Sequence, residues 1–200
     1  MFSVLSAARE ICESYAFSFR TDISGTLIFD YNSGLSEHFG KDGHLIPISA
    51  GFWCSRMVDL NIVRQVFVCL SAMDAIAFLH FNAGRFNRSE ELLFIAINPG
   101  RNYPQELSKE LRKAKINVLL GNDLLDILHA IRFCMDYRGI KVCFTLQDEL
   151  VVFSFYDHSL FIPQHELALR RFFLLAKIRP FFRQYVPKSK ISFLHDFLNQ

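Results

Sequence analysis

Residues 66–81 read VFVCLSAMDAIAFLHF, and this stretch decides the fold that the sequence predicts. It begins as an apolar run, breaks at Ser71, and resumes with apolar residues three and four apart, which predicts a buried strand followed by a helix. Ser71 and Asp74 fit a capping box, in which a hydroxyl and a carboxylate satisfy free amides at a helix start. A strand that turns directly into a helix is the unit of parallel α/β sheets, whose ligands bind at the carboxyl ends of the strands. We therefore expect any site to border residues 70–74.

The composition indicates a folded chain with a large core. The sequence has 200 residues, 51% of them hydrophobic, and it includes 22 Phe. No run reaches the roughly 18 apolar residues of a membrane span, and the first residues lack the layout of a signal peptide. The five Cys form no CxxC pair, so buried, reduced thiols in a cytoplasmic protein are the simplest interpretation.

Strand and helix patterns alternate through the middle of the chain. Strands are predicted at residues 65–70, 92–97, 116–120 and 140–145, and helices at 72–81, 104–115 and 124–137. This βαβαβαβ order predicts an α/β fold with a Rossmann-like, mostly parallel sheet and right-handed crossovers. Residues 150–156 are expected to add an antiparallel hairpin strand through a turn at 147–149.

The flanks carry weaker patterns. A helix is predicted over residues 3–17 and a strand over 26–31, followed by turns and a possible short strand at 44–48. The segment from residue 163 onward is expected to be helical and is interrupted by Pro180 and Pro187. We expect one compact domain in three parts, which are an N-terminal segment (1–64), the α/β core (65–157) and a basic helical extension (158–200).

Charge is distributed unevenly along the chain. The net charge is +2, but from residue 165 onward seven Lys and Arg face two acids, so this segment carries +5 and the rest carries −3. A basic tail with interleaved Phe and Tyr predicts a nucleic-acid partner, DNA or RNA, because cations neutralise phosphates and rings stack on bases. The alternative is a core helix with a solvated basic face. The candidate residues are Arg170, Arg171, Lys177, Arg179, Arg183 and Lys188, with Arg101 after the second predicted strand.

Two short motifs stand at the predicted strand ends. LSAMDAI occupies residues 70–76, after the first strand, and GNDLLD occupies residues 121–126, after the third. Together with the order of elements over residues 65–146, they resemble the Toprim fold of primases and topoisomerases. The resemblance is nearest to primase-like and mobilisation proteins of plasmids and conjugative elements, whose motifs read roughly ESxxDAL and DNDxxG. It implies a role in DNA replication or in the processing of mobile elements.

The departures from that pattern concern the catalytic acids. The resemblance implies a Glu as general acid/base and an Asp pair that holds Mg²⁺, yet Leu70 and Gly121 stand at the Glu position and the first Asp position. Leu can neither transfer a proton nor ligate a cation, and Mg²⁺ requires hard oxygen ligands. Only Asp123 matches, with Asp126 displaced from the pattern. We therefore expect a catalytically inactive protein without a cofactor, and Mg²⁺ only if the site is active.

Other interpretations stay open. Asp74, Asp123 and Asp126 could serve a Mg²⁺-dependent nuclease or nucleotidyltransferase, whereas the simpler interpretation is that Asp123 caps a helix and Asp126 lies at its positive end. A third interpretation is a protein-interaction scaffold that forms a homodimer or binds another protein. The sequence has no P-loop motif, no zinc-ligand spacing and no complete nucleophile elbow.

Overall fold

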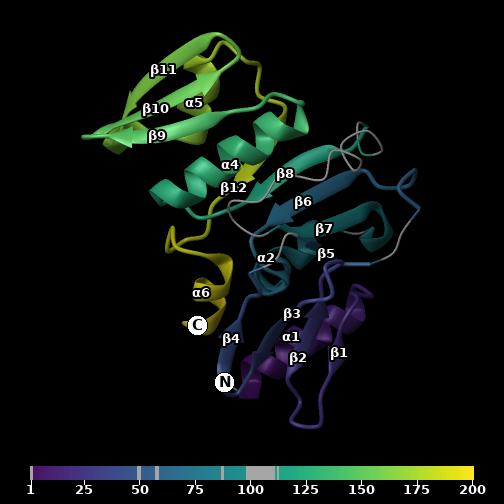
Figure 1. Cartoon of the computed structure of the whole chain (residues 1–200). Helices are drawn as coiled ribbons and strands as arrows, with labels where there is room; N and C mark the ends of the chain where they lie inside the picture. The colour runs from purple at the N-terminus through teal and green to yellow at the C-terminus, as the bar shows by residue number, and fades with distance from the viewer. Residues whose placement is uncertain (1, 49–50, 57–58, 87, 98–110, 112) are drawn as a thin grey trace.

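A five-stranded sheet in the order β12-β8-β6-β7-β5 runs through the middle of the protein (Figure 1). The structure is a computed structural model and describes residues 2–48, 51–56, 59–86, 88–97, 111 and 113–200. Four strands are parallel, namely β6 (Gln65–Cys69), β7 (Leu92–Ile97), β8 (Lys115–Leu119) and β12 (Phe182–Tyr185). The fifth, β5 (Phe52–Cys54), pairs antiparallel with β7 at one edge, so the protein is α/β with a mixed sheet.

Both faces of this sheet are buried. Phe67 of β6 stacks on Phe94 of β7, with ring centroids 4.7 Å apart, in the core that α2 (Ala72–Asn82) and α1 (Phe2–Ser14) share. The neighbouring Val66 and Val68 belong to the core on the opposite face, against α4 (Leu124–Tyr137). Successive strand residues point to opposite faces, so burial of both explains the continuous apolar run in the sequence.

An antiparallel sheet lies on the α2 side of the molecule (Figure 1). Its strands are β1 (Arg20–Thr21), β2 (Leu27–Asp30), β3 (Ser36–Gly40) and β4 (Gly43–Leu45), in that order across the sheet. The predictions of the first helix, the strand over residues 26–31 and a short strand near residue 44 are confirmed to within a few residues. β3 was not predicted, because its sequence SEHFG lies between turns and has little apolar character.

The predicted fourth parallel strand at residues 140–145 is wrong. Instead, β9 (Cys143–Gln147), β10 (Leu150–Phe155) and β11 (His158–Pro163) form a separate antiparallel sheet, covered by α5 (Leu169–Leu175). The hairpin between β9 and β10 is confirmed, with Gln147 opposite Leu150 across the turn. A two-residue turn lets this segment pair with the strand that follows it in the chain, so it pairs there and not with the central sheet.

The prediction of a wholly helical C-terminal extension is also wrong. Residues 158–200 contain β11, α5, the strand β12 and the short helix α6 (Phe193–Leu198). β12, with the sequence FRQY between Pro180 and Pro187, supplies the fourth parallel strand beside β8. The prolines cannot continue a helix, so a short extended segment fits between them. Most of the predicted helix over residues 104–115 lies outside the described residues, and its last residue, Lys115, begins β8 instead.

Within the described ranges, no helix combines the length and the apolar character needed to cross a bilayer.

Candidate functional site

The tips of β6 and β8 meet at one edge of the central sheet. The two strands are parallel neighbours, with Val68 opposite Val118, and β7 lies on the other side of β6. In open α/β sheets, ligands bind outside the carboxyl ends of the strands at such a switch point, where consecutive connections run in opposite directions. The segments that follow β6 and β8, residues 70–74 and 121–126, therefore lie side by side, and we call the junction between them the crevice.

A buried carboxylate from the N-terminal sheet occupies the start of α2. Glu37 of β3 is 0% exposed, and it accepts hydrogen bonds from the backbone N–H groups of Ala72 (2.7 Å) and Met73 (3.0 Å). Tyr31 donates its hydroxyl to the same carboxylate at 3.0 Å, and His44 Nε2 lies 2.9 Å from Glu37 Oε1. A helix N-terminus attracts anions, because its first amides are unpaired and its dipole is positive there. In this protein the anion is part of the chain.

Tyr31, which donates to Glu37, is itself buried. Burial first, and then the adjacent carboxylate, raise the pKa of Tyr31 well above its usual range. The phenol therefore stays protonated and remains a donor to Glu37. Since a buried charge is tolerated only when it is well hydrogen-bonded, this arrangement ties the N-terminal sheet to the core.

Both carboxylate oxygens of Asp74, a candidate metal ligand in α2, accept hydrogen bonds from within the chain. Its Oδ2 accepts a hydrogen bond from the Ser71 hydroxyl at 2.8 Å, and its Oδ1 accepts from the Leu194 N–H of α6 at 3.1 Å. Ser71 Oγ in turn accepts from the Asp74 N–H, which confirms the hydroxyl half of the predicted capping box. The Asp74 carboxylate accepts from the Ser71 hydroxyl and from α6 instead of from an amide at the start of α2. Burial raises the pKa of Asp74, against the lowering effect of these hydrogen bonds. This carboxylate joins α2 to α6.

The other two candidate acids lie at the start of α4. Asp123 is the N-cap, and its side chain accepts from the Asp126 N–H at 2.8 Å, as the capping interpretation predicted. Asp126 is buried, and its pKa is raised to about 6, first by burial and then by the charges of Asp123 and Asp74. A hydrogen bond from the Gly121 N–H lowers this pKa and offsets part of the rise.

The segment before α6 closes the crevice at Gly121. The Asn122 N–H donates to the Lys190 carbonyl at 3.0 Å, which brings residues 190 and 191 against the tip of β8. A Cβ at Gly121 would overlap the Asp126 carboxylate and the Ile191 carbonyl oxygen. A metal-binding Asp therefore has no room at this position, which gives a steric reason for the glycine.

The acids at the crevice do not converge on a common point. Among the described residues, no group of three or more His, Cys, Asp or Glu is arranged so that it could hold a metal ion. The oxygens of Glu37 and Asp74 face backbone amides and hydroxyls of the chain itself. Arg101, the candidate after β7, lies outside the described residues.

Asp126→Asn tests the electrostatics of the crevice. Because the native pKa of about 6 lies above the ordinary value of about 3.9, the folded state binds more protons than the unfolded state between these values. The contribution of Asp126 to stability is therefore lost as pH rises from about 4 to about 6. We expect the variant to be more stable than wild type by about 1 kcal/mol at pH 7.5, with no such gain near pH 3.5. Urea unfolding at the two pH values measures this, and an equal effect at both would contradict it.

A second cluster of candidates surrounds the edge strand β12. Three hollows of ≈ 680, ≈ 680 and ≈ 380 Å³ lie along it, and we call them together the β12 groove. Phe182 lines both of the larger hollows, and Arg85 and Tyr185 line both the second and the third. Seven exposed cations line the groove: Arg85, Lys115, Arg170, Lys177, Arg179, Arg183 and Lys188.

The groove collects five of the seven basic residues that the sequence singled out. The exceptions are Arg101 and Arg171, which pairs with Glu166 instead. Phe172 and Phe173, the first aromatic residues of the basic tail, are fully buried in the core, as expected. Phe181, Phe182 and Tyr185 are half-buried beside the cations, and the Arg183 guanidinium lies 4.9 Å above the Tyr185 ring.

Sequence reasoning missed three residues of these two sites. Glu37 lies 35 positions before Ala72 and carries no local signal of its contact. Arg85 and Lys115 come from the end of the α2 segment and the start of β8, and only the parallel pairing of β12 with β8 brings them beside the basic tail.

Compared with models of known protein families, with curated proteins and with solved structures, the chain matches none of them. The Toprim resemblance thus remains an expectation from two short motifs.

Proposed function

We propose that this protein binds nucleic acid along the β12 groove and does not catalyse a reaction at the crevice between β6 and β8. The proposal keeps the role that the Toprim resemblance implies, in primase-type replication or mobile-element processing, but moves the contact with nucleic acid to the sheet edge. The observation that carries it is the excess of cations beside half-buried rings in three hollows along β12 that share lining residues.

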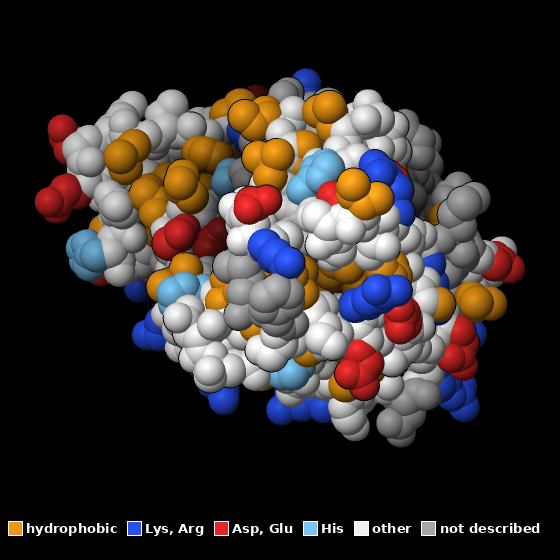
Figure 2. All heavy atoms as spheres, turned by 90° about the horizontal axis from the view of Figure 1, so that it is seen from below, with side chains coloured by type: hydrophobic (Ala, Val, Ile, Leu, Met, Phe, Trp, Pro, Cys, Tyr) orange, Lys and Arg blue, Asp and Glu red, His pale blue; other side chains and the backbone are white. Residues whose placement is uncertain are grey.

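Cations outnumber carboxylates in the groove. Across the described residues, none of the seven takes part in an ion pair, and the only carboxylate lining the three hollows is Asp196. Lys and Arg side chains lie among Asp and Glu on the face shown in Figure 2. A cluster with an excess of cations attracts a polyanion, and release of its counterions drives the association.

The aromatic residues favour a single strand over a duplex. Phe182 and Tyr185 are half-buried beside the cations, and the Arg183 guanidinium lies 4.9 Å from the Tyr185 ring centroid. Phe181 already packs between Tyr137, stacked at 5.5 Å, and Arg138 at 4.4 Å, so it is not counted among these platforms. Bases of single strands stack on such platforms, whereas bases in a duplex are already stacked on each other. We therefore assign single-stranded DNA or RNA as the ligand.

The experiment compares a groove variant with a matched control. Arg179→Gln/Arg183→Gln removes two exposed groove cations, and Lys141→Gln removes one exposed cation that lines none of the three hollows. Fluorescence anisotropy of a labelled oligonucleotide should show about tenfold weaker binding for the double variant, and a change of less than about twofold for the control. Equal affinities of wild type and the double variant for the oligonucleotide would contradict binding along the β12 groove.

A scaffold function remains the second candidate, favoured by the outer face of the β9–β11 sheet. Val152 and Phe161 are direct partners across this face, and Phe161 is 57% exposed. Exposed apolar side chains of this kind mark protein contacts when they form a large patch. This function would be favoured if analytical sedimentation showed a stable homodimer and the Phe161→Ser variant were monomeric. The geometry gives less support to an active Mg²⁺-dependent enzyme, because the acids of the crevice accept hydrogen bonds from groups of the chain itself.

A further inference from the structure

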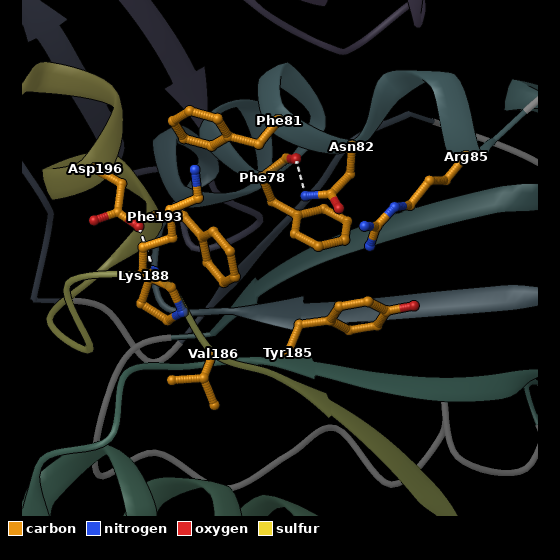
Figure 3. Close-up of a pocket in the computed structure, with 10 residues that line it drawn as sticks. Phe78, Phe81, Asn82, Arg85, Tyr185, Val186, Lys188, Phe193 and Asp196 are labelled. Atoms are coloured by element: carbon orange, nitrogen blue, oxygen red, sulfur yellow. Dashed lines mark hydrogen bonds between the residues drawn. The ribbon is translucent and has the colours of Figure 1, made fainter. Parts of the chain in front are cut away.

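The smallest hollow of the β12 groove is a distinct pocket between α2, the end of β12 and α6 (Figure 3). Four aromatic side chains line it, from Phe78, Phe81, Tyr185 and Phe193. The rings of Phe78 and Phe193 are almost wholly buried and meet edge to face, with centroids 5.2 Å apart. Phe81 is 39% exposed, so it offers an accessible ring over a rigid floor.

Cations stand at the two ends of this pocket. Arg85 faces Tyr185 across one end, and Lys188 lies with Asp196 at the other (Figure 3). The Asp196 carboxylate accepts from the backbone N–H groups of Lys188 (2.6 Å) and Ser189 (3.0 Å). Against the effect of burial, these hydrogen bonds hold the pKa of Asp196 below its usual value, so its charge persists beside Lys188. Neither cation pairs with it among the described residues, and Arg85 has no acid at its end of the pocket.

Asn82 adds a polar group with a fixed orientation. Its amide nitrogen donates to the Phe78 carbonyl at 2.9 Å, within α2. This bond leaves Asn82 Oδ1 as an acceptor at the wall of the pocket (Figure 3). A planar ligand that lies against the rings can donate an N–H to it.

The geometry points to this pocket as the site that takes one unstacked nucleotide, an inference that rests on the proposed function. The base stacks on the exposed ring of Phe81, its N–H groups face Asn82, and its phosphate pairs with Arg85 or Lys188. The volume of ≈ 380 Å³ is near the lower end of the range for ligand pockets, which suits a single nucleotide and excludes a duplex. The nucleotide can be free or part of a strand, and the test separates these sources.

The test uses two variants that affect only this pocket. Phe81→Ala removes the accessible ring and Lys188→Gln removes one cation, and neither residue lines the two larger hollows. The probes are a 3′-labelled oligodeoxyadenylate, followed by anisotropy, and adenosine monophosphate, followed by calorimetry. We expect each variant to weaken oligonucleotide binding about five- to tenfold, as the loss of one stacking or phosphate contact predicts. Lys141→Gln should change it less than about twofold, and the melting temperatures should stay close to wild type.

The outcomes separate this inference from the proposed function. If Arg179→Gln/Arg183→Gln weakens oligonucleotide binding while Phe81→Ala and Lys188→Gln do not, the groove stands and the nucleotide pocket is overturned. If the oligonucleotide does not bind but adenosine monophosphate binds to wild type and not to Phe81→Ala, the pocket takes a free nucleotide and the proposed function falls. If neither probe binds to wild type, both are overturned.

Discussion

Glu37→Ala should lower the free energy of unfolding by about 4 kcal/mol, because each buried donor left without an acceptor costs about 1–3 kcal/mol. Three such donors lose their acceptor, the N–H groups of Ala72 and Met73 and the hydroxyl of Tyr31. A domain of this size is stable by only about 5–15 kcal/mol, so the variant should unfold at a much lower urea concentration. Far-UV circular dichroism during urea titration measures the effect.

The controls for this variant separate the buried carboxylate from acidic residues in general. Glu13→Ala breaks an exposed ion pair with Arg9 and should cost less than about 1 kcal/mol. Acetate or phosphate should bind at the vacated start of α2 and raise the melting temperature of Glu37→Ala, but not that of wild type. If Glu37→Ala proves as stable as Glu13→Ala, the carboxylate does not join the N-terminal sheet to the core.

Gly121→Asp should be destabilising by at least about 3 kcal/mol, from overpacking and from burial of an additional charge. The new side chain would meet the Asp126 carboxylate and the Ile191 carbonyl, which are both acceptors and offer it no donor. The backbone of Gly121 is not in the left-handed region, so the cost arises from the side chain and not from a strained φ. Urea unfolding and proteolysis of the segment after β12 measure it.

Gly84→Ala provides the matched control, because a Cβ at Gly84 meets no atom within 4 Å. Its effect should stay within about 1 kcal/mol of wild type. A Gly121→Asp protein with wild-type stability that also binds Mg²⁺ in calorimetry would show that the crevice is open. That result would restore the interpretation as a Mg²⁺-dependent nuclease or nucleotidyltransferase.

The parts of the fold that could be predicted are those with a local signal. Each of these signals involves residues only a few positions apart: the apolar run of residues 66–70, the hydroxyl of Ser71 and the helical spacing that follows. β6, α2 and the Ser71 cap are therefore found where they were expected. The same holds for Asp123 at the start of α4. The parallel direction of β6, β7 and β8 followed from the rule that successive βα units build a parallel sheet, but this rule does not place the first strand beside the third.

The parts that could not be predicted depend on contacts between distant segments. β12 is four residues long and pairs with β8, more than sixty positions earlier, so no periodicity marks it as a strand. Glu37 is a charged residue in a turn-rich segment, where solvent exposure is the normal expectation, and its burial follows only from the docking of β3 on α2. The basic residues were found by composition, but their gathering with Arg85 and Lys115 required the sheet order.

The salt dependence of oligonucleotide binding tests the central claim most directly. For a single strand, the logarithm of the association constant should fall against the logarithm of salt concentration with a slope of about −0.7 for each phosphate contacted. If four to seven of the seven groove cations are engaged, the slope for wild type lies between about −3 and −5. Arg179→Gln/Arg183→Gln should reduce its magnitude by about 1.4. A slope near zero, or a steep slope that the double variant leaves unchanged, would contradict the assignment of the β12 groove.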